Sequence, residues 1–277
     1  MPHAPSGDFK LYYEEVGDGY PILFIHEFAG DHTSWEPQMR YFSRRYRCVA
    51  YNARGYPPSD VPENGDDYSQ DHAVNDAVAV MDHLGIARAH IVGLSMGGFC
   101  TVHLGLRHGA RARSLLVAGC GYGAPTRDHE EFSKISRDLG ERIEREGWET
   151  ICEEYAQGPT RLSFKGKNPR GWREFADNLA THSGHGAAMH MRHVQGGRPS
   201  LWDFEDGLKA LPMPVLVVNG DTDTPCLETG LWLKRTIPNA GHWVLPNAGH
   251  TMNIEEPELF NQGLERFLAE AEASSPA

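Results

Sequence analysis

Short runs of apolar residues alternate along the chain with longer stretches in which apolar residues recur at helical spacing. The short runs predict strands at residues 21–26, 46–51, 89–93, 115–118, 215–219 and 242–245. They are near-continuous runs of aliphatic and β-branched residues, which is typical of parallel strands that are buried on both faces. Stretches at 71–84 and 258–270 predict amphipathic helices. This alternation predicts right-handed βαβ crossovers and a doubly wound, mostly parallel α/β sheet.

The region from about residue 124 to about 207 interrupts this alternation, because it contains no convincing parallel strand. It holds charged helical patterns, followed by a stretch rich in His, Met and Gly at 182–197. We therefore divide the chain into an α/β core, residues 1–123 and 208–277, and a helical cap, residues 124–207. The cap is expected over the carboxyl edge of the sheet, where open α/β folds bind ligands. Residues 10–16 predict one more strand, in a hairpin before the Gly-Asp-Gly sequence that follows them.

The amino-acid composition of the chain argues against several classes of binding partner. Lys and Arg total 26 and Asp and Glu total 38, so the net charge is −12. Such an acidic chain is not expected to bind nucleic acid or an anionic membrane. Its five cysteines form no Cys-x-x-Cys pair, which argues against a structural zinc site and favours free thiols in a reducing compartment. Without a signal-peptide pattern or an apolar stretch of about 20 residues, we expect a cytoplasmic protein. Its oligomeric state stays open, with a homodimer among the alternatives.

The strongest chemical signal is the sequence Gly-Leu-Ser-Met-Gly around Ser95. It follows the predicted strand at 89–93 and precedes a helical stretch at 99–107. Small residues two positions before and after a serine let a strand and a helix meet at a sharp turn that exposes the hydroxyl group. The motif also occurs by chance in loops, but its flanking strand and helix favour a nucleophile.

A serine nucleophile needs a general base, and His250 is the best of 15 histidines. It lies on the loop that follows the last predicted strand, and therefore at the carboxyl edge of the sheet. The nearest alternative, His242, begins that strand and lies at the opposite edge.

The acid that orients this base is expected on the loop after the strand at 215–219. Asp221 and Asp223 compete for this role, and we favour Asp223 because it lies deeper in the loop. Asp221 is expected to brace the loop. The chain order Ser, Asp, His is the order of α/β-hydrolases.

An oxyanion hole takes the amide of the residue after the nucleophile and a second amide from an earlier loop. The first is that of Met96. The second is that of Phe28, in the loop that follows the strand at 21–26. This loop also fits an ordinary connection between a strand and a capped helix, and both interpretations can hold.

These motifs together resemble α/β-hydrolases of the esterase, enol-lactonase and perhydrolase type. In that family the first loop commonly reads His-Gly before the oxyanion residue; here His26 and Phe28 match, and Glu27 replaces the glycine. Glu27 therefore brings a carboxylate close to the expected site. The loop after the second parallel strand resembles Asp-x-Arg-Gly-x-Gly-x-Ser, of which Arg54, Gly55 and Ser59 remain.

The last two loops also resemble the family pattern. Gly220 and Asp223 match Gly-x-x-Asp, and Gly249 and His250 match the histidine loop, with Glu-Glu-Pro at 255–257. The resemblance covers nearly all of the chain outside the cap and implies an α/β-hydrolase fold of about eight strands.

The resemblance implies a mechanism without cofactor or metal, acting on a small-molecule ester or lactone. Ser95 attacks a carbonyl carbon, His250 moves the proton, Asp223 orients His250, and the amides of Phe28 and Met96 hold the oxyanion. The same catalytic groups serve carbon–carbon bond hydrolases and perhydrolases. A receptor that reuses the fold is an alternative of another class.

Residues of the substrate pocket are harder to predict. His26 and Glu27 are expected beside the site, and Trp202, Phe204 and Trp232 are candidates for its apolar wall or for plain core. Four histidines of the cap fit a pocket lining or a solvated helix face better than a metal site, because no carboxylate pattern accompanies them. They are His182, His185, His190 and His193.

Overall fold

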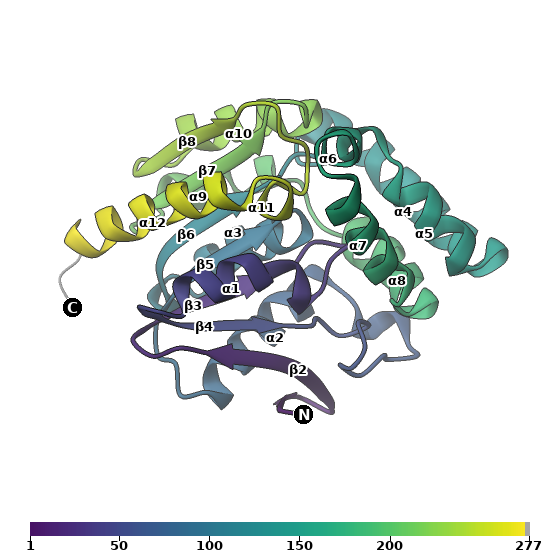
Figure 1. Cartoon of the computed structure of the whole chain (residues 1–277), viewed down its shortest axis with the longest axis horizontal. Helices are drawn as coiled ribbons and strands as arrows, with labels where there is room; N and C mark the ends of the chain where they lie inside the picture. Colours follow the sequence, from purple (N-terminus) through teal and green to yellow (C-terminus); the bar gives the residue numbers. More distant parts are fainter. Residues whose placement is uncertain (275–277) are drawn as a thin grey trace.

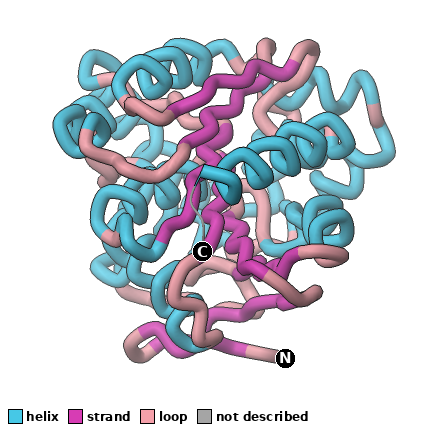
Figure 2. Tube along the Cα trace, turned by 90° about the vertical axis from the view of Figure 1, so that its left-hand side faces the viewer, coloured by secondary structure: helices cyan, strands magenta, loops and turns pink. Residues whose placement is uncertain are grey.

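The computed structural model describes residues 1–274, which form an eight-stranded sheet with helices on both faces (Figures 1 and 2). The strands lie in the order β1-β2-β4-β3-β5-β6-β7-β8. All neighbours from β4 to β8 are parallel, and β2 is antiparallel to β1 and β4. The predicted fold class is confirmed. The strands are β1 (His3–Ser6), β2 (Phe9–Val16), β3 (Tyr20–Ile25), β4 (Tyr46–Tyr51), β5 (Ala89–Leu94), β6 (Ala112–Ala118), β7 (Val215–Gly220) and β8 (Ala240–Leu245).

Within residues 1–274, six α-helices accompany the sheet, and the remaining α-helices lie between β6 and β7. The first group is α1 (Glu36–Phe42), α2 (Gln70–His83), α3 (Met96–Arg107), α10 (Thr224–Thr236), α11 (Met252–Glu255) and α12 (Pro257–Ser274). The second group is α4 (Thr126–Glu146), α5 (Trp148–Ala156), α6 (Leu162–Lys167), α7 (Pro169–Ala180), α8 (Gly184–Met189), the π-helical turn η5 (His190–Gln195) and α9 (Glu205–Lys209).

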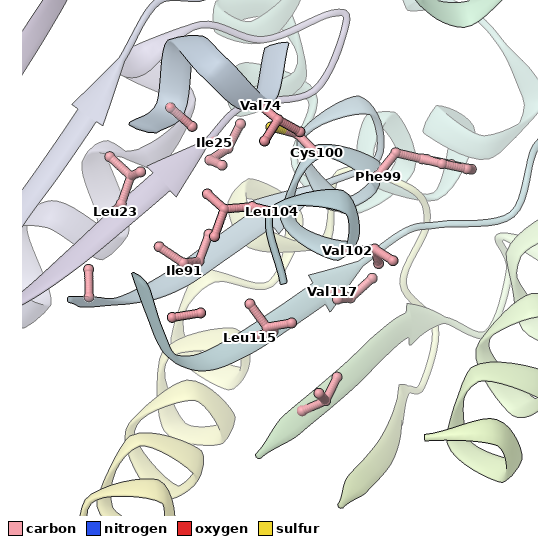
Figure 3. Close-up of a cluster of buried hydrophobic side chains, with 14 of the residues drawn as sticks. Leu23, Ile25, Val74, Ile91, Phe99, Cys100, Val102, Leu104, Leu115 and Val117 are labelled. Carbon is pink, nitrogen blue, oxygen red and sulfur yellow. The ribbon is translucent and has the colours of Figure 1, made fainter. Parts of the chain in front are cut away.

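The alternation of side chains along β3 explains why both faces of the sheet are covered. Leu23 and Ile25 point to a cluster with α2 and α3, whereas Ile22 and Phe24 point to a cluster with α1 and α12. Figure 3 shows the first cluster, in which side chains of β3, β5 and β6 meet α3. Each fully buried aliphatic side chain contributes about 1.5–3 kcal/mol through burial. This packing fixes the carboxyl ends of the parallel strands, from which the site is built.

The N-terminal hairpin differs from the simplest interpretation of the sequence. β2 pairs with β1 before it and with β4, and β4 separates it from β3. β1 has only four residues, His-Ala-Pro-Ser, and therefore carries no apolar alternation that would predict a strand.

The helices α4 to α8 gather at one side of the molecule (Figure 1). Their apolar side chains form one cluster with residues of the core loops, including Phe28, Tyr56 and Met96. Leu201 and Leu208 pack instead in the cluster of the sheet, and the expected boundary at 207 falls inside α9. Within residues 1–274, the helices are too short or too polar to cross a lipid bilayer.

Candidate active site

Ser95 lies on the sharp turn between β5 and α3, in a backbone conformation that side chains rarely tolerate. Its φ is 54° and its ψ is −113°, which costs on the order of 1–3 kcal/mol and persists only where packing enforces it. A Cβ atom at Gly93 would lie 2.1 Å from the carbonyl oxygen of Gly97, and one at Gly97 would lie 2.1 Å from that of Ile25. Glycine at both positions therefore lets β3, β5 and α3 approach, and Ser95 lines a cavity.

His250 and Asp223 meet on the loops that follow β8 and β7. The Nδ1–H group of His250 donates a hydrogen bond of 2.7 Å to Asp223 Oδ2, and both side chains are buried. Burial raises the pKa of Asp223, but His250 outweighs it and holds that pKa below its ordinary value. Burial lowers the pKa of His250, but the Asp223 carboxylate outweighs it and raises that pKa. Since Nδ1 carries the proton, Nε2 of the neutral ring is free to accept one.

The two competing residues have other partners. Asp221 accepts a hydrogen bond of 3.2 Å from the amide of Ala248 and so braces its loop. His242 lies on β8, with Nε2 2.9 Å from Asn219 Oδ1. Neither side chain lines the cavity that contains Ser95 and His250.

Two further residues contact Asp223, and the sequence analysis did not identify them. The Tyr122 hydroxyl donates to Asp223 Oδ1 at 3.4 Å, and its ring packs edge-on against His250 at 5.6 Å. The Cys226 thiol also lies beside the carboxylate, and burial raises its pKa well above the ordinary value. Both groups stay neutral near pH 7 and can donate hydrogen bonds that keep Asp223 ionised.

The cavity at Ser95 and His250 has a volume of about 290 Å³. Most of its remaining wall comes from the helical insertion, including Phe132, Ile135, Leu139, Tyr155, Arg161, Met191 and Arg198. A larger and more open depression, of about 750 Å³, lies between β8 and α12 and contains none of these groups. We place the site in the smaller cavity, because it alone holds the serine, the histidine and convergent polar groups.

The two predicted oxyanion donors lie on the loops beside Ser95. Met96 is the first residue of α3, so its amide has no partner within the helix. The carbonyl oxygen of Phe28 accepts a hydrogen bond of 2.9 Å from the Tyr56 hydroxyl, which fixes this part of the loop. Within residues 1–274, neither amide donates a hydrogen bond to another group. Two free amides on fixed loops can stabilise a developing oxyanion.

The family model of the α/β-hydrolase fold matches residues 20–257, which span β3 to the start of α12. The chain belongs to the α/β-hydrolase family. Its relatives include 3-oxoadipate enol-lactonase 1 of Acinetobacter baylyi, 28% identical, with 89% of this chain and 88% of the relative covered. The 2-hydroxymuconate semialdehyde hydrolase of Pseudomonas putida is 29% identical, with 97% and 94% covered.

Solved structures of other α/β-hydrolases superpose closely on this one. The enol-lactonase of Burkholderia xenovorans LB400 has a TM-score of 0.86 at 23% identity, with 97% of this chain and 100% of that chain covered. A thermophilic esterase of Thermogutta terrifontis has a TM-score of 0.85 at 25% identity, with 98% of each chain covered. The likeness at 23% identity establishes the fold alone.

Glu27 departs from the pattern that this α/β-hydrolase resembles, and the structure shows how its charge is balanced. Glu27 is 2% exposed, and its Oε2 lies 2.7 Å from Arg161 Nη2 and 3.9 Å from His250 Nε2. Arg161 comes from the insertion and is equally buried. Burial lowers the pKa of Arg161, but Glu27 outweighs it, so the pKa is raised and the guanidinium stays charged. Arg161 thus balances the charge of the Glu27 carboxylate, which lies beside the His250 imidazole.

The other residues predicted for the pocket lie outside its wall. The rings of Trp202 and Trp232 stack on each other at 3.8 Å and pack against the core of the sheet, and Phe204 packs beside them. His26 joins two loops, since its Nδ1 donates to the Glu27 carbonyl at 2.7 Å and its Nε2 accepts from the Ala53 amide at 3.0 Å. These side chains therefore support the loops and the core.

The four cap histidines have separate partners. His190 Nε2 lies 2.7 Å from the Arg54 carbonyl oxygen, and His185 Nε2 lies 3.1 Å from that of Pro62. His182 packs parallel to the ring of Trp148 at 6.5 Å, and His193 packs against Gly65. His185, His190 and His193 thus tie the cap to residues that follow β4.

Proposed function

We propose that this α/β-hydrolase cleaves a carboxylic ester or lactone of a small molecule through an acyl-enzyme at Ser95. The observation that carries the proposal is the hydrogen bond that His250 donates to Asp223, together with the cavity that His250 and Ser95 both line. A nucleophile on a strained turn, a base with a free Nε2 and an orienting carboxylate are the parts that acyl transfer needs.

Each step assigns a proton or a bond to one of these groups. His250 Nε2 removes the proton of the Ser95 hydroxyl while Oγ attacks the carbonyl carbon, and the amides of Phe28 and Met96 stabilise the oxyanion. His250 then protonates the leaving oxygen, and the ester bond breaks. Water, deprotonated by His250, attacks the acyl-enzyme. The bond to Ser95 Oγ breaks, His250 returns the proton to Oγ, and the acid is released. Loss of one oxyanion donor typically raises the barrier by about 3 kcal/mol.

Carbon–carbon bond hydrolysis and perhydrolysis use the same set of groups, and one relative is named 2-hydroxymuconate semialdehyde hydrolase. No contact within residues 1–274 favours either reaction over ester hydrolysis. The ester reaction is proposed because it needs no further reactant and no ketonisation of the substrate. A receptor would bind its ligand without using Ser95, His250 and Asp223 for catalysis.

The test is hydrolysis of p-nitrophenyl esters from acetate to decanoate by the wild type, with Ser95→Ala beside it. We expect turnover by the wild type, limited to acyl groups that fit a 290 Å³ cavity, and a loss of at least about 10⁴-fold in Ser95→Ala. Ser43→Ala, at the end of α1, is a matched control that should keep full activity. Equal activity of Ser95→Ala and the wild type would overturn the proposal. If an alkylphosphonate labels Ser95 stoichiometrically but the protein turns over little of any ester, a receptor role is favoured.

A further inference from the structure

Arg198 is a buried arginine in the wall of the cavity that contains Ser95. It follows η5 and is 3% exposed. Its guanidinium carbon lies 3.5 Å from the ring centre of Phe99 and 4.9 Å from that of Phe132. Phe99 lies one helical turn after Ser95, since its amide donates to the Ser95 carbonyl oxygen at 2.9 Å. Ser95, Phe99 and Arg198 thus line the same cavity.

The partners of Arg198 are all neutral. Its Nη2 donates to the Tyr122 carbonyl oxygen at 2.5 Å, and its Nη1 donates to Gln195 Oε1. The Nε–H group has no partner, although it is buried. A guanidinium has five N–H donors, so several stay available to a ligand.

The two buried carboxylates of the site have partners other than Arg198. Arg161 is paired with Glu27, and His250 with Asp223, but within residues 1–274 no carboxylate lies within 4.0 Å of Arg198. Burial lowers the pKa of Arg198 to about 9, so the group is still charged at neutral pH. A buried charge without a counter-ion is destabilising, and an anionic ligand would supply the missing charge.

We propose that Arg198, together with Gln195, binds a carboxylate on the acyl part of the substrate, a proposal that rests on the proposed function. The acyl part is favoured because it stays in the cavity as the acyl-enzyme, whereas the alcohol of an ester departs before water attacks. Part of the cavity wall is apolar, with Phe132, Ile135 and Leu139, and fits the methylene chain between the two carbonyl groups. The substrate class is thus the monoester of a short dicarboxylic acid, or a lactone that carries a free carboxylate.

The first arm of the test compares matched substrates. Monomethyl glutarate and monomethyl adipate are each paired with the neutral ester of equal chain length, methyl pentanoate and methyl hexanoate, and the acid products are measured by chromatography. We expect the wild type to prefer the anionic member by about 10- to 100-fold in kcat/KM, as a charged hydrogen bond implies. In Arg198→Met this ratio falls to about one, and in Arg198→Lys it falls only in part. Arg170→Met removes an exposed arginine of α7 and keeps the wild-type ratio.

Thermal unfolding of Arg198→Met distinguishes a role of Arg198 in substrate binding from a purely structural role. Because Arg198→Met removes an unpaired buried charge, its Tm should equal or exceed that of the wild type. A lower Tm, with equal losses on both substrates of a pair, would mean that Arg198 only supports the loop of Tyr122. Two results would overturn the proposal: Ser95-dependent turnover of neutral esters without preference for anionic ones, or a preference that survives in Arg198→Met.

A calorimetric arm does not depend on catalysis. Glutarate is titrated into wild type, Arg198→Met and Ser95→Ala. We expect binding to the wild type and to Ser95→Ala, and none to Arg198→Met. If no ester is turned over, the proposed function fails, and this arm alone decides the carboxylate site: binding that is lost in Arg198→Met supports it, and absence of binding to the wild type overturns it.

Discussion

Glu27 stands where the family pattern has glycine, so it places a buried carboxylate beside the catalytic groups. A carboxylate 3.9 Å from His250 Nε2 raises the pKa of the imidazole, and Arg161 opposes this effect. The same carboxylate stands on the loop of the oxyanion donor Phe28, where an unbalanced negative charge would oppose the developing oxyanion. Arg161 removes that conflict, because it holds Glu27 in a buried ion pair.

The variant Glu27→Gln tests this arrangement. Because Glu27 raises the pKa of His250, its neutralisation lowers that pKa and moves the acidic limb of the kcat/KM profile to lower pH. In the wild type the limb is expected above pH 6.5, the ordinary pKa of histidine, since His250 must be neutral to act as the base. Glu27→Gln also leaves Arg161 buried and unpaired, so the free energy of unfolding should fall by about 3–5 kcal/mol.

Its control is the double variant with Arg161→Met, which leaves no unpaired charge and should recover most of the stability in urea unfolding. An acidic limb that does not move in Glu27→Gln would contradict the proposed coupling between Glu27 and His250.

Residues of the site differ in how far the sequence predicts them. Ser95, Asp223 and His250 each follow a predicted strand, so strand polarity alone brings their loops to one edge of the sheet. Arg161 and Arg198 come from the insertion, where no local pattern distinguishes a buried arginine from an exposed one. Trp202 and Trp232 are candidates for the pocket or for the core on sequence alone, and the packing of the core decides where a large ring lies. The catalytic roles of the first three residues stay a prediction.

The helices and strands, like the residues of the site, divide into those that the sequence predicts and those that it does not. Six strands of the sheet follow from continuous apolar runs, because burial on both faces leaves few positions for polar side chains. β1 has too few residues for a pattern, and its pairing is set by β2. The short helices α6 and α8 and the turn η5 were not distinguished, since helices of about six residues are stabilised by tertiary packing rather than by their own sequence.

An ion pair on α2 illustrates how one element is fixed to the loop after β4. Asp76 accepts hydrogen bonds from Arg54 Nε at 2.8 Å and Nη2 at 2.6 Å, and from the Ser6 hydroxyl at 2.6 Å. Both charged groups are buried. Asp76→Asn leaves Arg54 without a counter-charge, so we expect the free energy of unfolding to fall by about 3–5 kcal/mol in urea titrations.

Asp82 offers a matched control on the same helix. It pairs with Arg111, but its side chain is 61% exposed, and Asp82→Asn should change the free energy of unfolding by less than about 1 kcal/mol. Equal effects of the two substitutions would show that the buried pair has no special role in holding α2.

At the scale of the whole molecule, the cap and the core share one hydrophobic cluster. Trp148, Phe164 and Phe175 of the insertion pack in the same cluster as Phe28 and Tyr56 of the core loops. The cap has no separate core to hold it together after these contacts break. We therefore expect the two parts to unfold together.

The variant Phe164→Ala tests this expectation. Phe164 is almost fully buried, and its truncation should lower the free energy of unfolding by about 3–5 kcal/mol. Urea unfolding measured by tryptophan fluorescence and by far-UV circular dichroism should still give one coincident transition. Leu162→Ala, which removes a 53% exposed side chain from the same helix, should have an effect within about 0.5 kcal/mol. A separate early transition in Phe164→Ala would show that the cap unfolds independently.

The central claim is that Ser95 forms a covalent acyl-enzyme with the help of His250. The most direct measurement treats the protein with a p-nitrophenyl alkylphosphonate and locates the adduct by peptide mass spectrometry. The account predicts one adduct, on Ser95, that forms in step with the loss of esterase activity and is absent in Ser95→Ala and strongly slowed in His250→Ala. An adduct on another residue, or ester turnover that persists while Ser95 is fully labelled, would contradict it.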